Sequence, residues 1–426
     1  MIRILPYSQT HMDAIFARVE PKTDVTTTVR EIIANVIKDG DRALLSYCER
    51  FDGAKLQSLE VSPQELDAAM SAVEPEFIRI LETAAGNIRK YHQNQVRSGF
   101  EIQGADGVVM GQKVIPVDRV GIYVPGGTAA YPSTVLMDSI PAKIAGCGQI
   151  VMVTPPGKDG SVNPAILAAA KIAGVDRIFK IGGAQAVAAL AYGTQSVPKV
   201  DKIVGPGNAF VAEAKRQVFG QVAIDMIAGP SEILVVADSS ANPAYVAADL
   251  LSQAEHDKLA SAVLVTDSMA LAQAVQAQIE QQLETLERRQ IARESIDNNG
   301  KIIVADTLDA AVEISNAIAP EHLELCVENP FDYLDKIRHA GSIFMGSYCP
   351  EALGDYLAGP NHTLPTSGTA RFSSPLSVDD FVKRSQYTYY TPEALKKVAP
   401  DVAYFARTEG LTAHARSAMI RLEEDK

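Results

Sequence analysis

The chain has 426 residues, of which 47% are hydrophobic and 21% charged, and its formal net charge is −13 at pH 7. At roughly 100–200 residues per domain, this length predicts two to four domains that each bury a core. The acidic balance repels phosphate backbones and anionic membranes, so we exclude nucleic-acid binding and attachment to membrane surfaces.

The N-terminus and the cysteines indicate the compartment in which the protein works. The first residues, MIRILPYSQT, lack the basic and apolar regions of an export signal. No apolar run of ~18 residues is free of charge and proline, so no membrane-spanning helix is predicted. The four cysteines form no C-x-x-C pair, which indicates free thiols in a reducing environment. We therefore expect a cytoplasmic protein.

The first hundred residues are predicted to be mainly helical. Apolar residues recur at helical spacing over Thr26–Asp39, Pro63–Val73 and Pro75–Gln95, and the two prolines suit first-turn positions. No group of residues suited to chemistry is evident here. We expect residues 1–105 to form a helical N-terminal region that serves in docking or dimerisation.

From about Val114, short β-branched runs alternate with alanine-rich helical segments, and a second series of this kind starts near Ser231. It includes a long polar helix predicted over Met269–Glu294. Alternation of apolar strands with helices predicts parallel sheets that are covered by helices on both faces. The predicted fold class is therefore α/β, with two successive, incomplete Rossmann-like domains over residues 106–231 and 232–375.

The end of the chain differs in character from these domains. A linker-like stretch follows Ala370, and a short helical tail is predicted from Pro400 to Lys426. A tail domain over residues 376–426 is too small to bury a core alone, so it should dock on another surface. A second copy of the protein is one candidate for that surface.

Three glycine-rich turns each end a predicted strand and open a predicted helix: VPGG at 124–127, IGGAQA at 181–186 and VGPGNAF at 204–210. Ligands of parallel α/β sheets bind at the carboxyl ends of strands, so we expect functional residues to follow strands. Helix N-termini offer free N–H groups to an anion such as a pyrophosphate. No turn matches G-x-G-x-x-G, and tight turns need glycine without any ligand, so nucleotide binding and a structural role both stay open.

Gln253 and His256 lie three residues apart at the end of a predicted helix, so they share one helical face. An imidazole and an amide oxygen can both bind a metal ion. The alternative, which the local sequence favours, is that His256 is a C-terminal histidine in a favourable helix dipole. Asp355, in a loop rich in glycine and proline, is either a further metal ligand or a turn residue.

Glu321 and His322 are adjacent and precede a predicted strand. A neighbouring carboxylate and imidazole can serve as an acid–base pair near neutral pH. Adjacent side chains diverge on an extended backbone, so each would serve a different substrate atom. The alternative is that Glu321 caps or forms an ion pair while His322 packs. Glu409 and His414, in the tail, cannot be placed from their local sequence alone.

Long motifs in a fixed order resemble the histidinol dehydrogenase family from about Val114 to His414. They are GIYVPGG, IPAKIAGC, GGAQAVAALAYGT, VDKIVGPGNAFVAEAKRQV, IDMIAGPSEIL, DLLSQAEHD, APEHLEL, LGDYLAGPNH, LPTSGTARFSS and EGLTAH. The first hundred residues match more loosely. Cys349 and Thr363 stand beside motif residues where variation is expected, and His362 is near the site without being a ligand in the family pattern; we interpret it as a residue that supports the ligands.

The resemblance implies an activity: L-histidinol is oxidised through L-histidinal to L-histidine, the last step of histidine biosynthesis, with reduction of two NAD. It also implies an intertwined homodimer and one zinc ion per subunit, which positions the substrate. The implied zinc ligands are Gln253, His256, Asp355 and His414, the last donated by the partner subunit.

The resemblance further implies the role of each site residue. His322 removes the alcohol proton, and Glu321 activates water to hydrate the aldehyde. The substrate contacts are Ser231, Gln253, His256, His322, Asp355, Glu409 and His414. The NAD contacts are Tyr123, Gln185 and Asn208.

Two alternatives remain. A relative within the superfamily could oxidise another polyol or amino alcohol, such as a sulfopropanediol, but a sulfonate favours cations where Glu409 suits a cationic amine. A non-catalytic binding protein could keep the fold, but we would expect it to lose Glu321, His322 or one of the metal positions.

Overall fold

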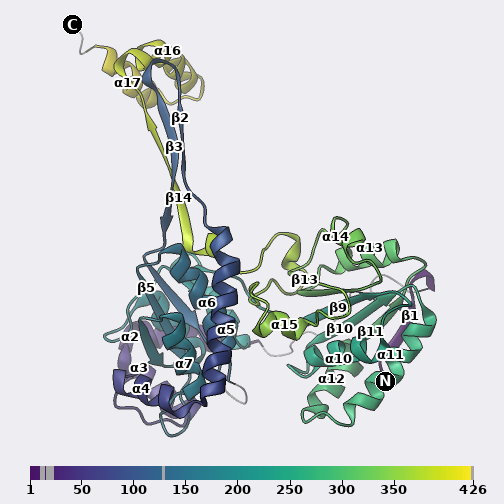
Figure 1. The fold of residues 1–426 in the computed structure, drawn as a ribbon. Coiled ribbons are helices and arrows are strands. Elements are labelled where there is room, and N and C mark those ends of the chain that lie inside the picture. Colours follow the sequence, from purple (N-terminus) through teal and green to yellow (C-terminus); the bar gives the residue numbers. More distant parts are fainter. Residues whose placement is uncertain (10–14, 16–23, 127–129, 424–426) are drawn as a thin grey trace. The chain divides into compact units, whose positions relative to one another are not determined.

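The computed structural model describes residues 1–9, 15, 24–126 and 130–423 (Figure 1). Gly127 of the VPGG turn and the last residues of the predicted tail helix lie outside this range. The chain divides into two compact units. The first unit is Met1–Gln95 with Val117–Phe381, and the second is Val96–Pro116 with Val382–Lys426. Among the described helices, none is long and apolar enough to cross a membrane.

The first sheet of the first unit has five parallel strands in the order β6-β5-β4-β7-β8. The strands are β4 (Arg119–Tyr123), β5 (Gln149–Thr154), β6 (Arg177–Lys180), β7 (Lys202–Val204) and β8 (Ala223–Ile224). The connecting helices are α6 (Pro132–Ala145), α7 (Pro164–Ala173), α8 (Gly183–Tyr192) and α9 (Ala209–Val218). The predicted alternation of strands and helices is therefore confirmed here.

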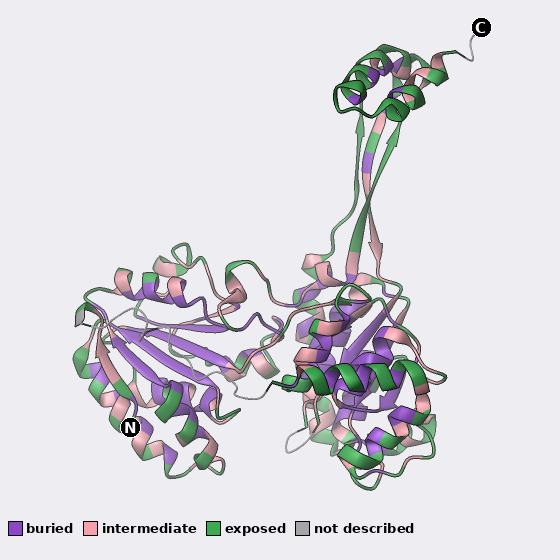
Figure 2. Cartoon of the chain, turned by 180° about the vertical axis from the view of Figure 1, so that it is seen from behind, coloured by how far each residue is buried: buried purple, intermediate pink, exposed green. Residues whose placement is uncertain are grey.

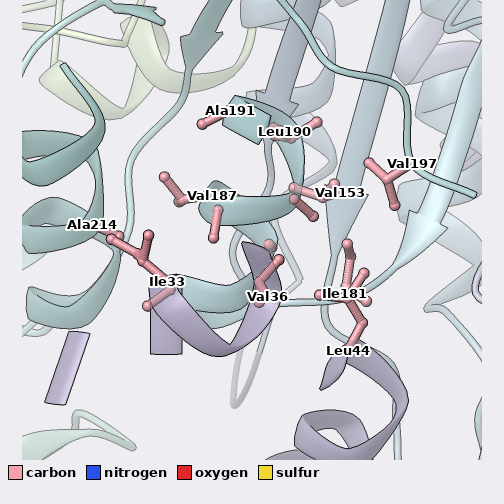
Figure 3. Close-up of a cluster of buried hydrophobic side chains, with 14 of the residues drawn as sticks. Ile33, Val36, Leu44, Val153, Ile181, Val187, Leu190, Ala191, Val197 and Ala214 are labelled. Carbon is pink, nitrogen blue, oxygen red and sulfur yellow. The ribbon is translucent and has the colours of Figure 1, made fainter. Parts of the chain in front are cut away.

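The N-terminal helices complete the layers on both faces of this sheet. They are α2 (Thr26–Asp39), α3 (Asp41–Tyr47), α4 (Pro63–Ala72) and α5 (Pro75–His92), as the apolar spacing predicts for three of them. Ile33 and Val36 of α2 lie in the same buried cluster as Val187 of α8 (Figure 3). Helices α4 and α5 share the opposite cluster with α6 and α7. This region is thus part of the core of the first sheet, while its role in dimerisation stays a prediction.

The second sheet has six parallel strands in the order β1-β11-β10-β9-β12-β13. The strands are β1 (Arg3–Pro6), β9 (Glu232–Ala237), β10 (Ser261–Thr266), β11 (Lys301–Val304), β12 (His322–Cys326) and β13 (Ser342–Met345). Its helices are α10 (Pro243–Ala254), α11 (Met269–Leu283), α12 (Arg289–Asn299), α13 (Leu308–Ile318), α14 (Phe331–Leu334) and α15 (Glu351–Tyr356). The central strands of both sheets are buried (Figure 2), as continuous apolar runs require, while the edge strands β1, β8 and β13 are only partly buried.

In this second half one element was not predicted and one expectation was wrong. The unpredicted element is β1, an edge strand within the mainly helical N-terminal region, which pairs with β11. The long helix predicted over Met269–Glu294 is two helices, α11 and α12. A straight helix would continue the buried face of α11 from Leu283 through Gln290 and Arg293, which are polar. The break instead turns Ala292 and Ile296 toward the core.

The second unit is built on an antiparallel sheet in the order β14-β3-β2. Its elements are β2 (Phe100–Gln103), β3 (Val109–Pro116), β14 (Val382–Tyr389), α16 (Pro392–Thr408) and α17 (Thr412–Met419). The prediction of a linker followed by a helix from Pro400 was wrong, because β14 comes first and α16 begins at Pro392. Strands β2 and β14 are largely exposed and β3 is only partly buried (Figure 2), so no long apolar alternation reveals them in the sequence.

The small core of the second unit agrees with the expectation that the tail cannot bury a core alone. Its buried apolar cluster consists of Ala403, Ala406 and Ala415, with Met419 packed against it. Tyr404 and Phe405 are exposed beside this cluster. The domain boundaries drawn from the sequence, at 105, 231 and 375, stay a prediction.

Candidate active site

One cavity in the first unit gathers most of the predicted site residues. Its volume is about 730 Å³, and its lining includes Asn208, Ser231, Gln253, His256, Glu321, His322, Asp355 and His362. The turn Gly205–Asn208 follows strand β7, as expected for a ligand site at carboxyl ends of strands. The second sheet contributes the amino ends of its strands to the cavity, because Ser231 directly precedes β9 and Glu321 directly precedes β12. The expectation that functional residues follow strands was therefore wrong for this sheet.

The acid–base pair converges on one backbone residue. His322 opens β12 and is 5% exposed, while Glu321 is 8% exposed. The backbone N–H of Glu232 donates to Glu321 Oε2 over 2.9 Å, and the carbonyl of Glu232 lies 2.8 Å from His322 Nδ1. A carbonyl can only accept, so Nδ1 carries the proton and Nε2 of the neutral ring is free to act as a base. The two side chains do not diverge, since Glu321 Oε2 lies 3.6 Å from His322 Nδ1.

Burial and charge set the protonation of this pair. Burial raises the pKa of Glu321 to about 8, although the neighbouring His322 opposes the rise. Burial alone would lower the pKa of His322, but the carboxylates of Glu321, Glu351 and Asp355 raise it. Because burial and neighbouring charges act in opposite directions on the pKa values of these two groups, the groups can exchange protons near neutral pH.

Several buried polar atoms around this pair lack a hydrogen-bond partner among the described residues. They are both side-chain atoms of Gln253, His322 Nε2 and Glu351 Oε1. Ligand atoms of His322, Glu351 and Asp355 lie within 4.8 Å of one another, a spacing that suits a metal ion. Leaving such atoms buried and unpaired is costly, so their presence together indicates a place that a ligand fills.

Asp355 and His256 complete the set of candidate metal ligands in the first unit. Asp355 lies in helix α15 and not in the loop that its sequence suggested. Burial opposes its ionisation, but the hydrogen bond and the charge of His362, together with His322 and His256, lower the pKa of Asp355 to about 2. His256 directly follows α10 and is exposed, yet burial of part of its ring lowers its pKa. An ionised carboxylate and a neutral imidazole are the forms that bind a metal.

His362 links Asp355 to the first sheet. Its Nδ1 lies 3.4 Å from Asp355 Oδ1, and its Nε2 lies 3.3 Å from Thr134 Oγ1 at the start of α6. The ring thus bridges a candidate metal ligand and a helix of the other sheet. This is the geometry expected of a residue that orients a ligand.

Glu351 was missed by the sequence reasoning. Its side chain is 2% exposed, and its Oε1 lies 3.5 Å from His322 Nε2. Glu351 stands four residues before Asp355 in CPEALGDY, so the two acids share one face of α15. This spacing was the available signal, but it only carries weight once α15 is known to be a helix.

The three predicted NAD contacts are placed differently. Asn208 lines the cavity and caps α9, because its Oδ1 accepts from Phe210 N and Val211 N. Tyr123 and Gln185 are buried and are not part of the cavity lining. The Tyr123 hydroxyl accepts a hydrogen bond of 3.0 Å from Gly183 N, which ties strand β4 to the second glycine-rich turn.

A buried ion pair holds the Gly205–Asn208 turn on the wall of the cavity. Lys215 Nζ forms an ion pair with Asp225 and also donates to Gly205 O over 2.9 Å. Gly205 N in turn donates to Asp225 Oδ2 over 2.8 Å. Gly205 has a φ of 112°, which a residue with a side chain rarely adopts. The ion pair therefore binds both the N–H and the carbonyl of Gly205, a residue whose backbone conformation requires glycine.

We expect Lys215→Met to lower the free energy of unfolding by about 3–5 kcal/mol, because it leaves Asp225 charged and buried without its partner. Chemical denaturation measures this loss. The matched control is Lys171→Met, which removes an exposed ion pair with Asp67 and should cost less than ~1 kcal/mol. Equal effects of the two substitutions would show that the Lys215 pair is not essential to the core.

Glu409 and His414 belong to the second unit. Glu409 ends helix α16, His414 lies in α17, and both side chains are exposed. The cavity described above is lined by residues of the first unit alone.

The chain is similar along nearly its whole length to proteins of one family. A family model described as histidinol dehydrogenase matches residues 17–422. The histidinol dehydrogenase of Clostridium acetobutylicum is 58% identical over 400 residues, 94% of this chain and 93% of that protein. That of Syntrophotalea carbinolica is 56% identical and covers the full length of both chains. A crystal structure of histidinol dehydrogenase from Elizabethkingia anophelis is 41% identical, with a TM-score of 0.93 over 99% of this chain and 98% of that chain.

Proposed function

Because the chain belongs to the histidinol dehydrogenase family, we propose that it oxidises L-histidinol through L-histidinal to L-histidine, with NAD as oxidant, as the last step of histidine biosynthesis in the cytoplasm. The observation that carries this proposal is the buried pair Glu321 and His322 beside unpaired polar atoms in one cavity. NADH production tests it, with L-histidinol compared against other amino alcohols and diols, including a sulfopropanediol. Faster oxidation of a diol than of L-histidinol would overturn the proposal.

The chemistry of the donor set supports zinc. Gln253, His256 and Asp355 of one subunit would hold it, with His414 from the partner subunit as the fourth ligand. When bound, zinc supplies a positive centre that orients the imidazole and amino nitrogens of the substrate. The unpaired side-chain atoms of Gln253 fit this role, because its amide oxygen needs an electropositive partner.

The first oxidation removes a proton and a hydride from the alcohol. His322 Nε2 accepts the hydroxyl proton, because Nδ1 is committed to the carbonyl of Glu232. Glu351, 3.5 Å from Nε2, stabilises the imidazolium that results. NAD, when bound, accepts the hydride. We propose that Asn208 on the cavity wall and the buried residues Tyr123 and Gln185 serve in its binding.

The second oxidation needs water. Glu321, as the carboxylate, removes a proton from the water that adds to the aldehyde, and the hydrate then loses a second hydride. Oxygen thus enters from water. The first step releases one proton and one hydride, and the second releases one hydride and, once the carboxylic acid ionises, two protons. Keeping the aldehyde in the cavity between the steps prevents its loss to the solvent.

Metal content tests the zinc site directly. We expect stoichiometric zinc in the purified protein, with loss of activity on chelation and recovery on adding zinc. Asp355→Ala should lower the zinc content well below one per subunit, since it removes the only charged ligand from the set. The control is Glu409→Ala, which should keep its zinc. Active protein without any divalent metal would remove the basis of the site.

We also propose that the second unit serves a homodimer. Its small core and its exposed Tyr404 and Phe405 indicate a surface that is covered in the assembly. In such a dimer, His414 would complete the partner's metal site, and Glu409 would contact the cationic amine of the substrate.

Mixed dimers test the donated ligand. His414→Asn and His256→Asn should each be inactive alone. A dimer of one of each contains one intact site, so random mixing should restore up to roughly a quarter of the wild-type activity. Mixed dimers that form but stay inactive would place His414 in the site of its own subunit.

A further inference from the structure

Glu232 stands at the centre of the acid–base pair without belonging to it. It is the first residue of β9, and its side chain is among the most buried polar groups, at 2% exposure. Its backbone N–H holds Glu321 Oε2, and its carbonyl holds His322 Nδ1. One backbone residue therefore orients both bases.

The side chain of Glu232 anchors that backbone to a turn distant in sequence. Glu232 Oε1 accepts a hydrogen bond of 2.7 Å from Ser367 N. Ser367 has a φ of 57°, a left-handed conformation that strains the backbone of a residue with a side chain. Such strain persists only where surrounding contacts hold it, and the bond to Glu232 is one of those contacts.

A second contact fixes the same segment from its other end. Thr366 Oγ1 accepts a hydrogen bond of 2.6 Å from Gly229 N. A Cβ at Gly229 would lie in close contact with Ser367 Oγ, so the two segments approach each other closely at this glycine. The turn at Thr366–Ser367 thus forms hydrogen bonds with the segment Gly229–Glu232 on both sides of Ser231.

We propose that Glu232 is a positioning residue, whose buried carboxylate, bonded to Ser367 N, fixes the backbone that aims Glu321 and His322 at the substrate. The inference rests on the roles proposed above for these two bases. The hydrogen bond to Nδ1 also selects the ring tautomer with a free Nε2. Misplacing a catalytic group by 1 Å can cost about 100-fold in rate.

Because Glu232 would position both bases, its loss should have a kinetic effect that differs from the loss of either base alone. Loss of the Glu232 anchor should slow both oxidations by a similar factor, because both bases depend on it. Substrate affinity should change little, since the proposed metal ligands Gln253, His256 and Asp355 are positioned by α10 and α15 and not by β9. Substitution of Glu321 or His322 should affect mainly one step.

The test compares Glu232→Ala with Glu232→Gln, measuring kcat and KM separately for L-histidinol and L-histidinal. Glu232→Ala should lower kcat about 100-fold for both substrates, with similar KM and wild-type zinc content. Glu232→Gln keeps an acceptor for Ser367 N and should recover most of the rate. If Glu232→Ala does not fold, Glu232→Asp carries the test, because its shorter side chain withdraws the acceptor.

Leu264→Ala is the control for general destabilisation. Leu264 is fully buried in β10 beside β9, so its truncation should lower the stability of the protein and leave both rates near wild type. Unchanged rates in Glu232→Ala, loss of one step only, or a Gln variant as slow as the Ala variant would each overturn the inference. If His322→Asn and Glu321→Gln have no effect in the same assays, the proposed roles of the bases fail instead.

Discussion

Replacing His322 with asparagine is expected to slow the oxidation of L-histidinol by about 10²–10⁴-fold, the contribution of a well-placed general base. The asparagine amide can still donate to the carbonyl of Glu232, so the strand start should keep its geometry. It has no counterpart of Nε2, and no other described nitrogen base lies so close to both Glu321 and Glu351. The alcohol proton would then have no acceptor as hydride leaves.

Stopped-flow measurement of NADH formation from L-histidinol reports this loss. Zinc content should stay near wild type, because His322 is not among the proposed zinc ligands. A His322→Asn enzyme that oxidises L-histidinol within a few-fold of the wild-type rate would mean that another group removes the proton.

Replacing Glu321 with glutamine is expected to slow the oxidation of L-histidinal by a similar factor of about 10²–10⁴, while oxidation of the alcohol continues. Glutamine keeps an oxygen to accept from Glu232 N, so the change removes the base and not the contact. The variant should therefore release or accumulate the aldehyde. Trapping the aldehyde with a carbonyl reagent measures this directly.

The pH dependence gives the same prediction a second test. Burial raises the pKa of Glu321 to about 8, so at pH 7 most of the carboxyl is protonated and cannot accept a proton from water. The fraction in the basic form grows with pH, so the aldehyde step should accelerate as pH rises through about 8. Glu321→Gln should lose this rise. Equal loss of both oxidations in this variant, or a wild-type aldehyde step that is flat over the same range, would contradict the separate roles of the two bases.

The sequence predicts the parallel sheets because their strands are buried on both faces. The runs IVMV within QIVMVT and ILVVA within SEILVVA are continuously apolar, and each leads into a helix. The edge strand β1 was not predicted, since its partner β11 lies about 300 residues away and nothing local signals the pairing. The strands of the second unit were not predicted for a related reason. Strand β14 is exposed and β3 is only partly buried, so their sequences carry no clear apolar period.

The candidate site was only partly accessible from local patterns. Gln253 and His256 lie at the same helix end. A histidine at that position is explained by the helix dipole as well as by a metal site. The fold changes this balance by placing Asp355, Glu321 and His322 around the same cavity. Glu232 and Glu351 could not be found in this way, because their importance comes from contacts with residues far along the chain.

The yield of NADH from each L-histidinol tests most directly whether one cavity carries out both oxidations. With limiting L-histidinol and excess NAD, the wild-type enzyme should form two NADH per substrate, with L-histidine as the product and no aldehyde free in solution. Glu321→Gln should approach one NADH per substrate, with the aldehyde recovered. A wild-type yield of one NADH, with L-histidinal accumulating, would contradict the assignment of the second oxidation to this site.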